Sequence, residues 1–223
     1  MMRRIFSMRR AAFALFLLGV TAVAATHLGQ RARPYVGQPF IMEFRQVYRD
    51  AAGNERLEGT GTRWQGSNGA WKSVTNYLDR AGNFNFALIT YSVPGRGVYA
   101  VRGGKLVYVS EASTNWRRLS VEEMRQHANY VREEKVLGFD AVVMNTNSPP
   151  GMVIQEFIFP QLQGLPLKSV DITPSGEGTT VEPVRIELTE PSADIFRLPD
   201  LPEDDSYYRQ KQARVASKGG GGK

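Results

Sequence analysis

Residues 40–48 read FIMEFRQVY, and their side chains alternate between two sets. One set comprises Phe40, Met42, Phe44, Gln46 and Tyr48. Successive side chains of a β-strand point to opposite faces, so this period of two predicts a strand. Residues 50–54 then combine Asp, Gly and Asn, which favours a hairpin turn. The stretch therefore opens an antiparallel meander.

The same alternation continues toward residue 188, with turn signals roughly every 8–12 residues. Gly103-Gly104 is a two-residue hairpin signal between two such runs. We predict further strands over residues 55–65, 71–79, 84–91, 97–101, 105–110, 135–145, 152–159, 167–172 and 179–189.

One segment has a helical period instead. Ser120 and Glu123 have the spacing of a capping box, in which each side chain binds the backbone amide of the other residue. Val121, Met124 and Val131 then recur on one helical face. We predict a helix over residues 121–134 and a short helical turn over 192–196.

Several strands are apolar on both faces. Phe84 and Phe86 alternate with Ala87 and Ile89, and the strands near residues 139 and 157 behave alike. A sheet with two apolar faces needs a cover on each face, or a cover and a sheltered cavity. We predict an α+β fold, with a large curved antiparallel sheet (a half-barrel) packed on one main helix plus short helices.

Residues 1–25 have the three parts of a secretory signal peptide. Four arginines precede an apolar run over residues 11–25, which ends in small residues. We predict cleavage near Ala24 and a periplasmic or secreted location in a bacterium. The alternative is an uncleaved membrane anchor, but a spanning helix needs roughly 20 apolar residues and this run has about 15.

The chain has no cysteine. An exported chain without thiols cannot form disulfides, so its core must be stable through burial alone. A lipid-bearing cysteine at the mature N-terminus is excluded as well. About 199 residues remain after cleavage, which is enough for one domain with a sizeable core. We predict that domain over residues 26–205.

The net charge of +6 comes from the two ends of the chain. Residues 1–25 hold four basic residues and residues 209–223 hold five, and neither segment holds an acid. Without these nine, 19 of the 28 basic residues remain against 22 acidic ones, a net charge of −3 for residues 26–208. This mildly acidic body argues against a nucleic-acid partner. Residues 206–223 are basic and Gly-rich, and we predict a disordered tail there.

Several short motifs along the mature chain carry a family resemblance. They are Gly69-Ala-Trp71 with Tyr77, residues 97–101, residues 134–139, Gln155-Glu-Phe157, residues 165–168 and residues 191–199. With the signal peptide and the meander, they resemble the LolA/LolB-like half-barrel superfamily, which includes periplasmic lipoprotein carriers and RseB-type envelope-stress sensors. The resemblance implies a bent sheet of roughly ten strands around a few helices. The missing cysteine departs from the LolB-type receptor and is compatible with the soluble LolA-type carrier.

No catalytic constellation emerges. The chain has two histidines, His27 near the predicted cleavage site and His127 on the predicted helix. A zinc site needs three or four ligands within reach, and neither cysteine nor a histidine pair supplies them. Gly59-Thr-Gly61 lacks the third glycine of a dinucleotide motif. We therefore expect no enzyme activity, no metal and no cofactor.

Glu156 stands in a strongly apolar strand, among Ile154, Phe157 and Ile158. If it is buried it needs a partner, such as Lys168 or an arginine. We predict instead that it is exposed at an edge or on a face of the sheet.

The leading hypothesis is an exported binding protein that shelters a lipid, an acyl chain or another amphiphile in an apolar cavity. Its predicted lining is aromatic: Phe44, Trp71, Tyr77, Phe84, Phe86, Tyr99, Phe157 and Phe159. Burying a methylene group releases about 0.8 kcal/mol, so such a slot needs no polar catalysis. The alternative is an RseB-like sensor or scaffold that binds an envelope protein. Contact with the membrane is expected only transiently or through an uncleaved signal.

Overall fold

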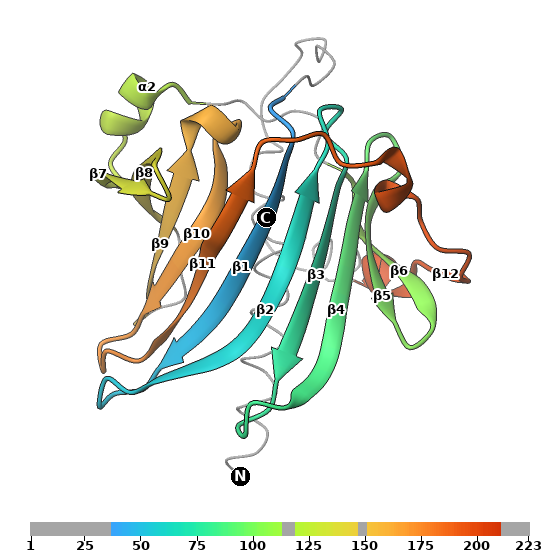
Figure 1. Cartoon of the computed structure of the whole chain (residues 1–223), viewed down its shortest axis with the longest axis horizontal. Coiled ribbons are helices and arrows are strands. Elements are labelled where there is room, and N and C mark those ends of the chain that lie inside the picture. Colours follow the sequence, from blue (N-terminus) through green and yellow to red (C-terminus); the bar gives the residue numbers. More distant parts are fainter. Residues whose placement is uncertain (1–36, 113–118, 147–150, 211–223) are drawn as a thin grey trace, which may run out of the picture.

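The structure, a computed structural model, describes residues 37–112, 119–146 and 151–210. These residues form one sheet of twelve strands in the order β12-β6-β5-β4-β3-β2-β1-β11-β10-β9-β8-β7 (Figure 1). The strands are β1 (Phe40–Arg49), β2 (Glu55–Gln65), β3 (Trp71–Leu78), β4 (Phe84–Val93), β5 (Gly97–Arg102), β6 (Lys105–Ser110), β7 (Tyr130–Val136), β8 (Phe139–Thr146), β9 (Val153–Phe159), β10 (Leu165–Ile172), β11 (Gly178–Glu187) and β12 (Glu203–Asp204). Every neighbouring pair is antiparallel except β12 and β6, which are parallel.

Two meanders meet at β1. The first runs from β1 to β6 and extends the sheet from one edge of β1, whereas the second runs from β7 to β11 and ends beside the other edge. Phe44 thus lies opposite Gly61 of β2 and Pro183 of β11. The sheet curves but is not closed, and β12 and β7 are its edge strands among the described residues (Figure 1). The prediction of a large curved antiparallel sheet is confirmed.

The two longest hairpins of the first meander have the same turn chemistry. Asp50 Oδ1 accepts hydrogen bonds from the amides of Ala52 and Asn54, at 3.0 and 2.9 Å. Asp79 Oδ1 does the same for Ala81 and Asn83, at 2.8 and 2.9 Å. Hydrogen bonds from the side chain and then the backbone amide of Asn54 lower the pKa of Asp50, and the bond from the Asn83 amide is the main cause that lowers the pKa of Asp79. Local side-chain bonds of this kind make such turns readable from sequence.

The predicted main helix is wrong in its extent. The capping box at Ser120 and Glu123 is present, but α2 spans only Val121–Arg125. The chain then becomes β7, because pairing with β8 satisfies a whole strand of backbone groups. Met124 packs on Val142 and Met144, so α2 covers only the β8 end of the sheet. Figure 1 shows it beyond that end, away from β1–β4.

The strand predicted over residues 135–145 is in fact a hairpin. Leu137 and Gly138 have φ values of 51° and 83°, which reverse the chain between β7 and β8. A left-handed leucine is uncommon, so the sequence pattern did not reveal the turn. The short helical turn predicted near residue 192 is confirmed as the 3₁₀ helix η2 (Ala193–Phe196), and a second one, η1 (Pro160–Leu162), precedes β10.

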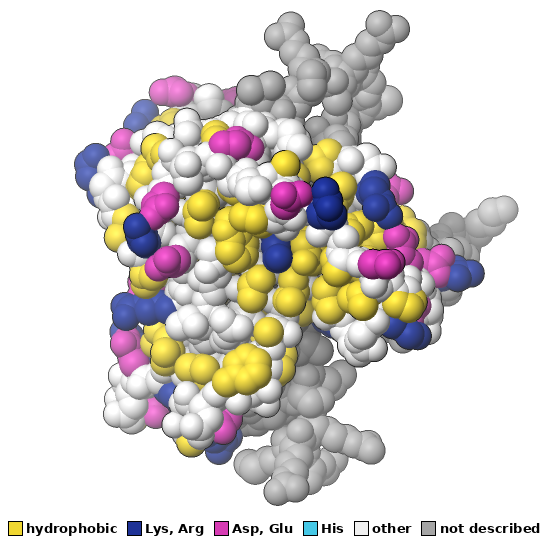
Figure 2. Space-filling view, turned by 45° about the vertical axis from the view of Figure 1, so that its right-hand side comes forward, with side chains coloured by type: hydrophobic (Ala, Val, Ile, Leu, Met, Phe, Trp, Pro, Cys, Tyr) yellow, Lys and Arg dark blue, Asp and Glu magenta, His cyan; other side chains and the backbone are white. Residues whose placement is uncertain are grey.

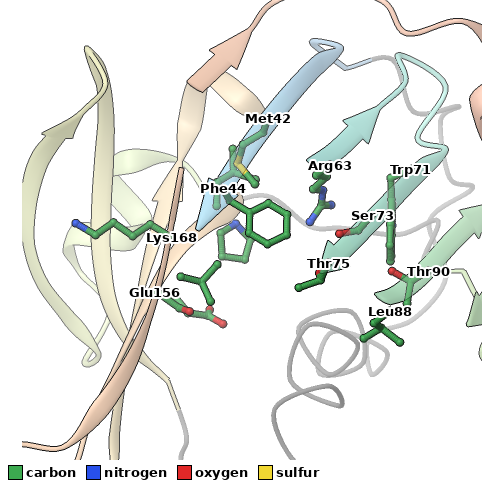
Figure 3. A pocket seen from close by; sticks show the side chains of 14 residues that line it. Met42, Phe44, Arg63, Trp71, Ser73, Thr75, Leu88, Thr90, Glu156 and Lys168 are labelled. Atoms are coloured by element: carbon green, nitrogen blue, oxygen red, sulfur yellow. The ribbon is translucent and has the colours of Figure 1, made fainter. Parts of the chain in front are cut away.

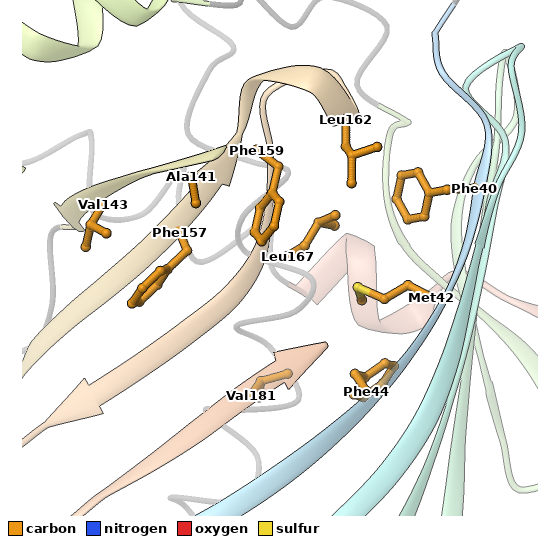
Figure 4. Packing of buried hydrophobic residues seen from close by; sticks show 10 residues of the cluster. All are labelled: Phe40, Met42, Phe44, Ala141, Val143, Phe157, Phe159, Leu162, Leu167 and Val181. Atoms are coloured by element: carbon orange, nitrogen blue, oxygen red, sulfur yellow. The ribbon is translucent and has the colours of Figure 1, made fainter. Parts of the chain in front are cut away.

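The main hydrophobic cluster lies where β1 meets the second meander (Figure 4). Its members are Phe40, Met42, Phe44, Ala141, Val143, Phe157, Phe159, Leu162, Leu167 and Val181. The prediction of strands buried on both faces holds for β8, where residues 141–144 are all buried. It is wrong for the start of β4, where Phe84 is 65% exposed and Phe86 45%. Figure 2 likewise shows apolar side chains gathered on one open face.

Parts of the predicted domain plan lie outside the described residues. These are the signal peptide over residues 1–25 and most of the predicted tail. The described chain continues as a helical turn over residues 206–210, which were assigned to the tail, and Tyr207 packs against Trp71 and its neighbours. No helix among the described residues is long and apolar enough to cross a membrane.

Candidate functional site

A small cavity lies on the inner, curved face of the sheet, with a volume of about 50 Å³ (Figure 3). Seven strands contribute to its walls, which combine apolar side chains with hydroxyl groups and with both basic and acidic residues. The lining residues are Met42, Phe44, Arg63, Trp71, Ser73, Thr75, Leu88, Thr90, Glu156, Pro166, Leu167, Lys168, Ser169 and Val181.

Strand register explains why these residues face one another. On one wall, Arg63 lies opposite Ser73, and Ser73 opposite Thr90. On the other wall, Val181 lies opposite Ser169, and Ser169 opposite Glu156. Residues directly opposite across antiparallel strands point to the same face, so each row projects into the cavity.

Gly61 allows the aromatic wall to form. A Cβ on this residue would lie 2.4 Å from Cζ of Phe44 and 2.3 Å from the carbonyl oxygen of Val74. The Phe44 ring therefore lies directly against the β2 backbone. Glycine in a strand often marks such a close approach. The Gly59-Thr-Gly61 pattern thus has a packing role.

Trp71 and Arg63 form a second part of the wall. The Arg63 guanidinium carbon lies 5.1 Å from the centre of the Trp71 ring, within the range of a cation–π contact. Arg63 Nη2 also donates to Gln65 Oε1 at 3.2 Å. The positive charge of this wall is therefore held in place beside the Trp71 ring.

Glu156 is the acidic group of the cavity, and the prediction that it is exposed is wrong. Its carboxylate points into the cavity, and burial raises its pKa to about 7 (Figure 3). Lys168, the partner considered from sequence, points away from the cavity. Its ammonium lies 4.3 Å from the Phe157 ring centre and 3.7 Å from Glu134. The half-buried carboxyl is thus not neutralised by Lys168.

The raised pKa predicts a pH-dependent stability. The ordinary pKa of 4.5 is raised to about 7 in the folded chain, so the native state binds the proton more tightly and stability falls as pH rises through that window. We expect Glu156→Gln to flatten this decline, by on the order of 1–3 kcal/mol between pH 5 and pH 8. Urea unfolding at several pH values measures it.

Asp171 supplies the matched control, since burial raises its pKa to about 6. Asp171→Asn should remove only the part of the decline below pH 6. Identical pH profiles for wild type and Glu156→Gln would contradict the assignment.

An aromatic ledge continues from the cavity along the same face. Thr75 and Leu88 line the cavity opposite each other, and the next pair with the same orientation is Tyr77 and Phe86. The two rings stack with centroids 4.7 Å apart. Burial raises the pKa of Tyr77 to about 12, whereas Phe86 remains half exposed. The Tyr77–Phe86 pair therefore adjoins the cavity on the same face of β3 and β4.

The structure separates the eight predicted lining residues. Phe44 and Trp71 line the cavity, and Tyr77 and Phe86 form the ledge. The other four residues do not line the cavity. Phe157 and Phe159 are buried in the main cluster, Tyr99 packs edge-on against Tyr108, and Phe84 is exposed at the start of β4.

Sequence reasoning missed the polar half of the lining. Arg63, Ser73, Thr75 and Thr90 alternate with outward residues in β2, β3 and β4, so periodicity could have placed them on the same face as Phe44. Only the apolar members of the alternating sets were chosen. Among the described residues no cluster of three His, Asp or Glu could hold a metal, and His127 is exposed.

The opposite face of the same strands carries a wider groove of about 590 Å³. It is bordered by charged residues, including Glu43, Arg45 and Arg56, and by the half-exposed side chains of Leu57 and Val184. That the chain binds an envelope protein stays a prediction.

Comparison with known proteins gives similarity at the level of the fold. No family model and no curated protein matches the chain. Among solved structures, MucB is 19% identical over 76% of this chain, with a TM-score of 0.41, and the match spans 60% of MucB. An uncharacterised conserved protein from Thermus thermophilus is 12% identical over 78% of this chain and 94% of its own, with a TM-score of 0.45.

A LolA superfamily protein from Nitrosomonas europaea is also similar. It is 12% identical over 73% of this chain and 91% of its own, with a TM-score of 0.36. The resemblance to LolA-like proteins is thus found again among solved structures. All three TM-scores lie below 0.5, so these similarities carry no information about function.

Proposed function

We propose that this chain is an exported, non-catalytic binding protein that holds one end of an amphiphilic ligand in the inner-face cavity. The observation that carries the proposal is the continuity between the cavity and the Tyr77–Phe86 ledge. An apolar chain on the ledge would run over Leu88 into the cavity. Small-molecule sites are typically apolar pockets with a few convergent polar groups.

The size of the cavity constrains how such a ligand binds. A water molecule occupies about 30 Å³ of liquid, so about 50 Å³ has room for only a small group. The rest of the ligand must lie on the ledge or displace adaptable side chains such as Met42. This cavity is smaller than the acyl-chain slot expected from sequence. The cavity therefore holds only one end of the proposed ligand.

Phe86→Ser tests the proposal. We expect it to weaken binding of N-phenylnaphthylamine, a neutral apolar probe, by about tenfold, because a buried phenyl contact is worth roughly 1.5–3 kcal/mol. Fluorescence titration measures the dissociation constant. Native mass spectrometry after gentle extraction would show whether the chain copurifies with a lipid.

Leu57→Ser is the matched control, because Leu57 is 40% exposed in the groove of the opposite face. It should leave probe binding unchanged. Equal weakening by both variants, or no probe binding at all, would contradict the proposal.

A protein partner is the second expectation for this chain. The groove beside Leu57 and Val184 is where we would place such a partner, since it combines apolar surface with bordering charges.

A further inference from the structure

The cavity and the strands around it contain acceptor groups without donors. Glu156 faces the cavity, and burial is the one influence that shifts its pKa, with no offsetting charge or hydrogen bond from the described residues. A buried ionised carboxylate without a partner is costly. Such an atom is a place where a ligand group can gain more than it does in water.

A second acceptor lies in the same row of the sheet. Gln46 is only 4% exposed, and its Oε1 has no hydrogen-bond partner, although its Nε2 donates to Glu58 at 3.3 Å. Register places Gln46 opposite Val181, which is opposite Ser169, which is opposite Glu156. Gln46 and Glu156 therefore face the same side of the sheet, with β11 and β10 between their strands.

A third acceptor adjoins this row. Asp171 lies two residues beyond Ser169 on β10, so it points to the same face. Its Oδ1 is buried without a partner, and burial raises the pKa of the carboxyl. Buried polar atoms are nearly always hydrogen-bonded in native proteins. The unpaired Gln46 Oε1 and Asp171 Oδ1, on the same face as Glu156, therefore favour a ligand group that donates hydrogen bonds.

We propose that the polar end of the bound amphiphile is a hydrogen-bond donor, a primary ammonium in the strongest case, received in the cavity by the carboxylate of Glu156. This inference rests on the proposed function and specifies its ligand class. A cavity of about 50 Å³ has room for a group the size of an ammonium, about that of a water molecule. An ammonium–carboxylate contact is a charge-assisted bond, stronger than a neutral one.

The charged groups around Glu156 have other contacts, which leaves its carboxylate available to a ligand. Lys168 points away from the cavity and is occupied by Phe157 and Glu134. Arg63 enters from the facing wall, where its guanidinium lies over Trp71 and donates to Gln65. No other lysine or arginine lines the cavity within the described parts of the chain. An anionic head group could meet Arg63, so the test must separate the two charges.

Isothermal titration calorimetry can distinguish a cationic from an anionic head group. The ligands are single-chain detergents, used below their critical micelle concentrations. The probes are dodecylammonium and dodecyl sulfate, which share the chain and differ in head-group charge. At pH 8, above the pKa of Glu156, we expect the full-length protein to bind dodecylammonium at least about tenfold more tightly. Glu156→Gln should remove that preference without weakening dodecyl sulfate.

Glu134→Gln is the matched control, because Glu134 pairs with Arg132 and Lys168 outside the cavity. It should leave both affinities unchanged. Equal affinities, a preference for dodecyl sulfate, or a preference that survives Glu156→Gln would overturn the inference while the amphiphile-binding function stands. Failure of both detergents to bind wild type would overturn the function as well.

Discussion

Phe159→Ala is expected to lower the free energy of unfolding by about 3–5 kcal/mol. Phe159 is fully buried and lies among Phe40, Leu162 and Leu167, where β9 turns through η1 into β10 (Figure 4). Truncation loses the transfer free energy of the ring and leaves a cavity that neighbouring strands cannot fill. Urea unfolding followed by circular dichroism measures the change.

Phe84→Ala is the control for this result, because it makes the same chemical change at a residue that is 65% exposed. Its effect should stay within about 0.5 kcal/mol, as for most surface substitutions. A comparable loss in both variants would mean that the cluster around Phe159 is not the main core.

Gly61→Ala should destabilise the chain by about 1–3 kcal/mol, the usual cost of overpacking. The added methyl group would meet the Phe44 ring and the backbone of Val74, and the backbone cannot move without breaking the β2–β3 pairing. The lower entropy of the unfolded alanine chain offsets only about 0.4–1 kcal/mol. The midpoint of urea unfolding reports the difference.

Thr60→Ala serves as the control, since Thr60 is the neighbouring residue on β2 and is exposed. It should change stability by less than about 0.5 kcal/mol. If Gly61→Ala proved neutral, the close approach of Phe44 to β2 would be wrong, and with it this wall of the cavity.

The first meander could be read from sequence because its signals are local. Asp50 and Asp79 each organise their own turn through bonds to backbone amides two and four residues away. Alternation over residues 40–48 similarly predicts which side chains share a face. Neither inference depends on a distant residue, so both survive in the structure.

The region after residue 120 shows where that reasoning fails. The capping box at Ser120 starts a helix, and apolar residues at helical spacing favoured extending it to residue 134. The chain instead pairs Glu133 with Val142 in β7 and β8. A whole ladder of backbone hydrogen bonds outweighs the weak helix preference of a short segment.

The cavity was the feature that the sequence predicted least well. Phe44 and Trp71 were predicted to line it, but Glu156 was placed on an exposed surface and Arg63 was not considered. Glu156 and Arg63 are about 90 residues apart in the chain and meet only because β11 returns to β1. Whether a lone carboxyl is buried depends on the pairing of β1 with β11, and periodicity carries no information about that pairing.

Local chemistry along the chain was therefore enough to specify strands, turns and the alternating faces of a large antiparallel sheet, because hydrogen bonds and periodicity act over a few residues. Pairing of β1 with β11, the short α2 and the burial of Glu156 were decided only when the two meanders met. Those features depend on contacts between residues far apart in the chain, and such contacts exist only in the folded sheet.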